Sequence, residues 1–133
     1  MSTLKVNTIQ NEAGTSSVPV GTVINGSAKA WVNFIGTGTV TIRRAHNVTS
    51  ITDNGTGSWT VNFSTPMADA QYAFSVSGPL NSAVDGRVTY GAAWQASNGT
   101  GKVMTTTSLK VMCYLLANDT MNDSETVCVT VFS

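Results

Sequence analysis

Apolar and polar residues alternate along much of this chain, which is the period of a half-buried β-strand. In residues 28–34, Val32 and Phe34 share one face of a predicted strand, while Trp31 lies on the other. A Gly-Thr-Gly turn follows, and residues 39–43 return as the second strand of a hairpin. We place Trp31, Val32 and Phe34 in the core or at a subunit interface.

A second hairpin is predicted directly after the first. Residues 47–52 and 58–63 flank the sequence Asp-Asn-Gly-Thr-Gly, and Asn-Gly tolerates the positive φ angles of a tight turn. Trp59, Val61 and Phe63 fall on one face of the returning strand, so we expect them in the core or at a subunit interface.

Further short strands separated by turn residues are predicted over the rest of the chain. They are expected at residues 72–76, 84–90, 92–96, 102–117 with a bend at 105–107, and 126–132. This spacing predicts an all-β fold, a single antiparallel β-sandwich or small barrel formed by residues 28–133.

Residues 1–27 are predicted to be an extended N-terminal arm. Residues 4–10 alternate as a lone strand, residues 11–17 have the composition of a linker, and the residues around Pro19 should be extended. A strand without a partner of its own can add to the sheet of another protein. The candidate anchoring residues are Leu4, Val6, Thr8 and Ile9.

The two cysteines lie in the last two predicted strands. If residues 109–117 and 126–132 form a hairpin, Cys113 and Cys128 face each other across it. The expected Cβ separation of about 4.5–5.5 Å is wide for a disulfide, and a cytoplasm is reducing. We favour two buried thiols, with a late bond as the alternative.

The composition of the chain narrows the classes of partner and the compartment that we expect for it. Charged residues are 11% of the chain, and seven basic residues balance seven acidic ones. No basic excess exists to neutralise phosphates, so nucleic acid is not an expected partner. No apolar run is long enough for membrane insertion, and no signal peptide precedes the arm, so we expect folding in a cytoplasm.

Candidate chemistry is sparse, and we expect neither an enzyme nor a cofactor. The single histidine, His46, has no nucleophile motif beside it and is interpreted as a loop residue. The acidic residues between 118 and 125 have oxygen ligands suited to Ca²⁺, but a solvated loop is favoured. Trp31, Trp59 and Trp94 could stack on sugars, although core or interface positions are favoured.

Two stretches resemble a known family. They are Lys-Ala-Trp-Val-Asn-Phe at 29–34 with the turn that follows, and Asn-Val-Thr-Ser-Ile-Thr-Asp-Asn-Gly-Thr-Gly at 47–57 with Thr-Val-Asn-Phe at 60–63. Together with the opening Leu-Lys-Val-Asn-Thr-Ile-Gln-Asn at 4–11, they look like the fibre-type virion proteins of tailed bacteriophages. The resemblance covers about residues 1–76.

The resemblance implies a virion component, assembled in the host cytoplasm as a homo-oligomer, most simply a trimer. The arm would bind other virion proteins, and the body would face the host surface and its glycans, as in a tail fibre. A chain of 133 residues has little room for a shaft. A capsid decoration (cement) or head-fibre protein is therefore the alternative, followed by a carbohydrate-binding module.

Overall fold

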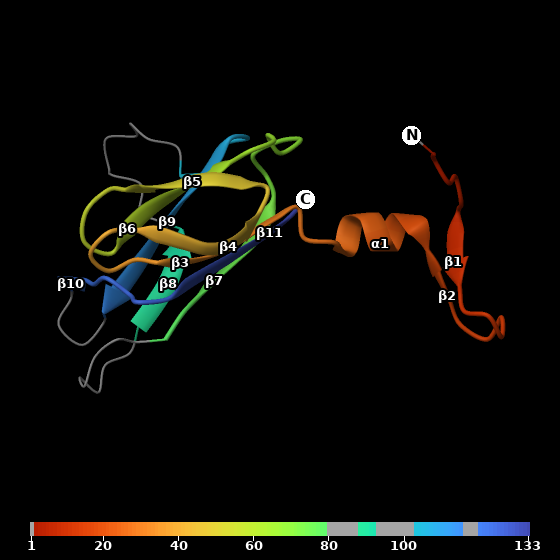
Figure 1. Cartoon of the computed structure of the whole chain (residues 1–133), viewed down its shortest axis with the longest axis horizontal. Helices are drawn as coiled ribbons and strands as arrows, with labels where there is room; N and C mark the ends of the chain where they lie inside the picture. Colours follow the sequence, from red (N-terminus) through yellow and green to blue (C-terminus); the bar gives the residue numbers. More distant parts are fainter. Residues whose placement is uncertain (1, 80–87, 93–102, 116–119) are drawn as a thin grey trace.

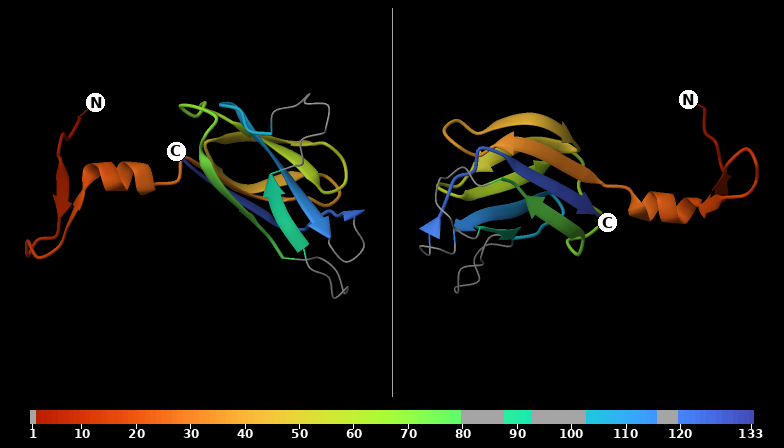
Figure 2. Two further views of the ribbon diagram at one scale, coloured as in Figure 1. Left: turned by 180° about the vertical axis from the view of Figure 1, so that it is seen from behind. Right: turned by 90° about the horizontal axis from the view of Figure 1, so that it is seen from below.

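The structure is a computed structural model that describes residues 2–79, 88–92, 103–115 and 120–133. It shows a β-sheet body and a narrow N-terminal arm that leaves the body at the end where the C-terminus lies (Figure 1). Two further views, from behind and from below, show the same separation of arm and body (Figure 2).

The first sheet of the body has four antiparallel strands in the order β4-β3-β11-β7. Their bounds are β3 (Ala30–Ile35), β4 (Thr41–His46), β7 (Ala73–Ser77) and β11 (Val127–Phe132). The predicted hairpin of residues 28–43 is therefore present, and its second strand continues to His46. His46 ends a strand, so its interpretation as a loop residue is wrong.

The second sheet is built around β9, which pairs antiparallel with β6, β8 and β10, while β5 pairs with β6. The strands are β5 (Val48–Asp53), β6 (Ser58–Phe63), β8 (Val88–Ala92), β9 (Ser108–Leu115) and β10 (Thr120–Met121). The two sheets pack together, so the body is all-β and sandwich-like, as the sequence predicts.

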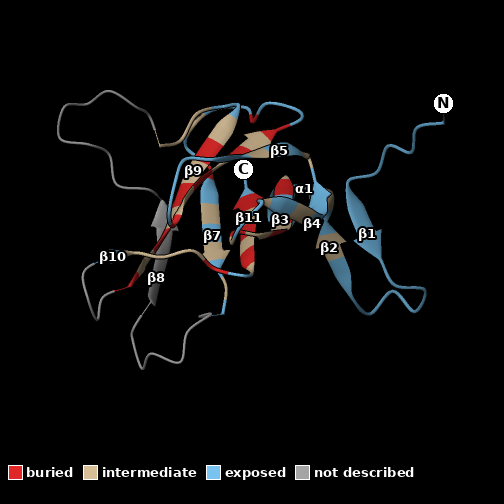
Figure 3. Cartoon of the chain, turned by 60° about the vertical axis from the view of Figure 1, so that its left-hand side comes forward, coloured by how far each residue is buried: buried red, intermediate tan, exposed pale blue. Residues whose placement is uncertain are grey.

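The core lies between the sheets and follows the alternation of the strands. Strand β6 buries its 59, 61 and 63 side chains, and β9 buries every second residue from Leu109 to Leu115. On the opposite sheet β3 and β11 do the same, which gives the banded colouring of the strands in Figure 3. The core side chains Phe34 and Trp59 meet edge to face across the sheets, with ring centroids 5.6 Å apart.

The β5–β6 turn needs glycine for two reasons. Gly55 and Gly57 both have positive φ, at 107° and 66°. A Cβ on Gly57 would also lie 2.7 Å from the carbonyl oxygen of Cys113, because Gly57 continues the pairing of β6 with β9 and its carbonyl accepts the Cys113 N–H. The Asn-Gly signal in the sequence thus marks a turn and a close approach of two backbones.

The predicted bend at residues 105–107 is present and precedes β9. The Thr105 hydroxyl accepts hydrogen bonds from the backbone N–H groups of Thr107 and Ser108, at 3.2 and 2.9 Å. This local side-chain bonding ends the extended chain and starts β9 at Ser108.

The predicted hairpin between the last two strands is wrong. β11 lies between β3 and β7 in the first sheet, while β9 lies in the second. The chain crosses between sheets before β11, where the carbonyl of buried Ser124 accepts the Gly36 N–H. The Ser124 hydroxyl lies 2.9 Å from the carbonyls of Pro79 and Thr126 and can donate its one proton to either. Strand spacing alone does not distinguish such a crossover from a hairpin.

The cysteines are consequently not opposed. Cys113 is buried in the core on β9. Cys128 lies on the outer face of the other sheet, half-buried, and its sulfur accepts a hydrogen bond from the Asn33 amide at 3.2 Å. The Cβ separation expected for a hairpin therefore does not apply.

The arm is more structured than the sequence predicts. β1 (Thr8–Gln10) pairs antiparallel with β2 (Ser17–Pro19), and α1 (Val20–Gly26) follows directly. The lone strand therefore has a partner inside the arm, the linker is a hairpin turn, and the segment after Pro19 is helical rather than extended. Proline fits here because it stands before the first helical residue, where no backbone N–H is needed by the helix.

Four predictions fall wholly or partly outside the described residues. The first concerns the strands at 84–90 and 92–96, of which the structure describes β8, and the second is the side chain of Trp94. The third is the strand at 102–117, of which residues 102, 116 and 117 are not described, and the fourth is the acidic loop at 118–125, of which residues 118 and 119 are not described.

Candidate functional site

No metal-binding cluster forms within the described ranges. No group of three or more His, Cys, Asp or Glu side chains gathers there as metal ligands would. Asp123, from the acidic loop, accepts the Gly57 N–H at 2.7 Å and so fixes the β5–β6 turn. No helix among the described residues is long and apolar enough to cross a membrane.

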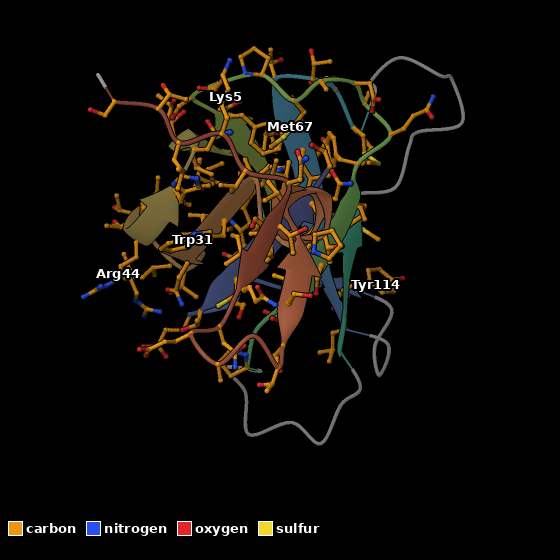
Figure 4. The ribbon with its side chains drawn as sticks, turned by 90° about the vertical axis from the view of Figure 1, so that its right-hand side faces the viewer. Lys5, Trp31, Arg44, Met67 and Tyr114 are labelled. Atoms are coloured by element: carbon orange, nitrogen blue, oxygen red, sulfur yellow. The ribbon has the colours of Figure 1, made fainter. Side chains whose placement is uncertain are left out.

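The predicted core residues divide into two groups. Val32, Phe34, Trp59, Val61 and Phe63 are buried. Trp31 is 38% exposed on the outer face of β3, where its ring stacks on His46 with centroids 6.5 Å apart. Figure 4 shows Trp31 on the outside of the body, with Arg44 extending away from it.

The predicted anchoring residues all lie on the surface of the arm. Leu4 is 85% exposed, Val6 is 42% exposed and Ile9 is 50% exposed. Leu4 and Val6 precede the hairpin, and Thr8 and Ile9 lie in β1. Three large apolar side chains are thus left in water on one short segment.

The arm hairpin is held by the polar residues that suggested a linker. Asn11 accepts the Ser16 N–H on its side-chain oxygen at 2.9 Å, and its own N–H bonds the Ser16 carbonyl at 3.0 Å. Gly14 takes the positive φ of the turn, and the Gln10 amide donates to its carbonyl. The hairpin carries a shallow groove lined by Ile9, Gln10, Asn11, Ser16, Ser17 and Val18.

Helix α1 has little reason to form by itself. Its sequence, Val-Gly-Thr-Val-Ile-Asn-Gly, contains two glycines and four β-branched residues, which together cost about 4 kcal/mol relative to alanines. No side chain caps its N-terminus, no charged residue lies in its first or last turn, and seven residues are far below the length of a stable isolated helix. Contacts outside the helix must supply its stability.

One face of α1 is apolar and uncovered. Val20, Val23 and Ile24 follow the i, i+3, i+4 spacing of a single helical face, and none of the helix residues is buried. Val23 is 38% exposed and Ile24 is 55% exposed. The spacing is visible in the sequence, but it spans too few turns to be distinguished there from an extended segment.

The body places two further exposed apolar side chains close to this helix. The Lys29 N–H bonds the Val131 carbonyl at 2.8 Å, so the end of β11 lies beside the point where the arm leaves. Phe132 follows at that point and is 38% exposed, as is Trp31. We call α1, Trp31 and Phe132 the neck of the molecule. The neck, the arm hairpin and the residues before that hairpin together hold the exposed large apolar side chains of the described residues.

Comparison of the chain with models of known protein families, with curated proteins and with solved structures finds no match.

Proposed function

We propose that this chain is a structural protein of a tailed-bacteriophage particle, of the tail-fibre type, attached through its N-terminal arm. The observation that carries the proposal is the arm itself, which extends from a closed body and exposes Leu4, Val6 and Ile9. The resemblance of residues 1–76 to fibre-type virion proteins supports the same role.

The arm hairpin suits attachment to a neighbouring protein in two ways. Among the described strands, β1 pairs with β2 alone, so each has a second edge able to accept a further strand. The apolar side chains before and within β1 can enter pockets on the same partner, which is the usual source of specificity in strand addition. In this role the body faces outward as a homo-oligomer, and host-surface glycans are the class of ligand it would meet.

A capsid decoration or head-fibre protein is the alternative. The described residues form one sandwich and an arm, with no repeated shaft among them, which suits a short protein seated on a shell. A carbohydrate-binding module is the third candidate, because exposed Trp31 stacked on His46 offers a ring face to a sugar.

Mass spectrometry of purified particles with isotope-labelled standards tests the proposal and separates the first two candidates. A tail fibre gives few copies per particle, whereas a decoration protein gives enough copies to cover the shell. Absence of the chain from washed particles, despite its expression in the infected host, would overturn both.

A further inference from the structure

We infer that the neck is the surface through which copies of this chain join one another, with the α1 helices packed side by side on their Val20, Val23 and Ile24 faces. The inference goes beyond the proposed virion role. The two stand apart, because a neck that joins copies does not require a phage particle, and an arm that anchors to a particle does not require the neck.

The stability of α1 points to a partner that is present as soon as the chain folds. The helix is too short and too rich in glycine and β-branched residues to persist alone, and no side chain caps its N-terminus. A partner met only at a late stage would leave it without support until then. Another copy of the same chain is available from synthesis onward.

The chemistry of the helix suits self-association. It contains no charged residue, so identical copies approach without like-charge repulsion. Gly21 and Gly26 have open space around them, which allows the backbones of neighbouring helices to come close. Lys29, which follows the helix, donates from its ammonium group to the Ile24 carbonyl at the helix end.

The apolar surface continues from the helix onto the body. Trp31 and Phe132 lie close to the arm exit, so helices meeting through α1 would bring these ring surfaces of the bodies together as well. The exposed apolar residues therefore extend from the helix onto the sandwich.

The extended arm leaves surface open for an interface. The chain exposes 8388 Å², whereas a compact monomer of 13.9 kDa exposes about 6,700 Å². The arm, which stands out from the body, contributes to this difference, and a standard interface needs only roughly 800 Å² per partner.

The test uses the full chain and a pair of matched variants, measured by sedimentation equilibrium over a dilution series. V23A/I24A removes the apolar face, while T22A/N25A changes two residues on the opposite face of the same helix. Both raise the intrinsic helix propensity, since alanine is the best helix former, so a difference between them reports the face and not the helix.

We expect the unaltered chain and T22A/N25A to sediment as a multiple of 13.9 kDa at micromolar concentration. V23A/I24A should raise the concentration of half-dissociation by at least about tenfold. The body of each variant should give the same near-ultraviolet circular dichroism. A monomeric unaltered chain, or equal dissociation of the two variants, would overturn the inference, whatever the outcome for particle attachment.

Discussion

At the residue scale, Asn47 controls the corner where the chain passes from one sheet to the other. It is the single residue between β4 and β5 and has a φ of 53°. Its amide donates to the carbonyls of Lys29 and Thr65, each at 3.1 Å, and its side-chain oxygen accepts the Thr65 N–H at 2.7 Å. One side chain thus ties the arm exit, the corner and the chain after β6.

Two substitutions separate the hydrogen bonds of Asn47 from its positive φ angle. Asn47→Gly keeps the backbone conformation but loses three hydrogen bonds, which should lower the free energy of unfolding by about 2–3 kcal/mol. Asn47→Ala should lower it by a further ~1 kcal/mol, because a Cβ disfavours the left-handed conformation. Denaturant unfolding measures both, and equal stability of the two variants would show that the φ angle imposes no strain.

Phe63 tests the inner face of β6. Its ring is buried and meets the ring of Tyr72 edge to face, with centroids 5.8 Å apart. Phe63→Ala should lower the free energy of unfolding by about 3–5 kcal/mol, because it removes the ring and leaves a cavity. A loss below about 1 kcal/mol would place this face in solvent.

The raised pKa of Tyr72 predicts that the folded chain loses stability at alkaline pH. Burial raises the pKa of its hydroxyl above the ordinary value of 10.0, against the lowering effect of a hydrogen bond with the Thr105 backbone, and the hydroxyl donates to the Ser108 carbonyl at 2.9 Å. The folded state therefore holds this proton more tightly than the unfolded chain. Its contribution is complete below the unfolded pKa and is lost as the pH rises through the folded pKa.

Unfolding measured from about pH 9 to 11 should show this loss, and Tyr72→Phe should weaken it. The variant lacks the hydroxyl, so it should also be about 1 kcal/mol less stable at neutral pH, where the bond to Ser108 is missing. An equally steep alkaline decline in Tyr72→Phe would assign the effect to other groups.

At the scale of elements, the local hairpins were predictable and the long-range pairing was not. The β3–β4 and β5–β6 hairpins follow from alternation and from glycines that serve the turns. β11, the last strand of the sequence, pairs with β3, the first strand of the body. This pairing depends on the packing of the sheets and not on residues that are neighbours in the sequence.

The same reasoning explains what was missed in the arm. The turn between β1 and β2 is held by side-chain bonds of Asn11, whose residue type is equally common in linkers. Helix α1 has under two turns and poor intrinsic propensity, so its sequence carries almost no helical signal. Leu4, Val6 and Ile9 stand out in the sequence as apolar residues in a polar segment; the structure leaves them exposed, and their anchoring role stays a prediction.

The strand order predicts the behaviour of the thiols. Because Cys113 is inside the core of one sheet and Cys128 is on the outer face of the other, no disulfide should join them after oxidation. Each denatured chain should react with two equivalents of a thiol reagent, and in the folded chain Cys128 should react before Cys113. If protein that was oxidised while folded shows no reactive thiol once it is denatured, that result would contradict the strand order.

At the scale of the whole molecule, the apolar side chains fall into two groups, one buried in the sandwich and one exposed on the arm and neck. The sandwich closes its own core, while the arm and neck keep Leu4, Ile9, Ile24 and Phe132 exposed. The proposed attachment to a particle rests on the second of these groups, because its apolar side chains remain uncovered in the single chain.

The most direct test of the attached role is the occupancy of particles by a chain that lacks residues 1–17. The deletion removes the exposed side chains before β1 and one full strand of the hairpin, and leaves α1 and the body intact. We expect the shortened chain to fold, with the cooperative unfolding of the body unchanged, and to be absent from purified particles that carry the full chain. Occupancy equal to that of the full chain would contradict the anchoring role of the arm.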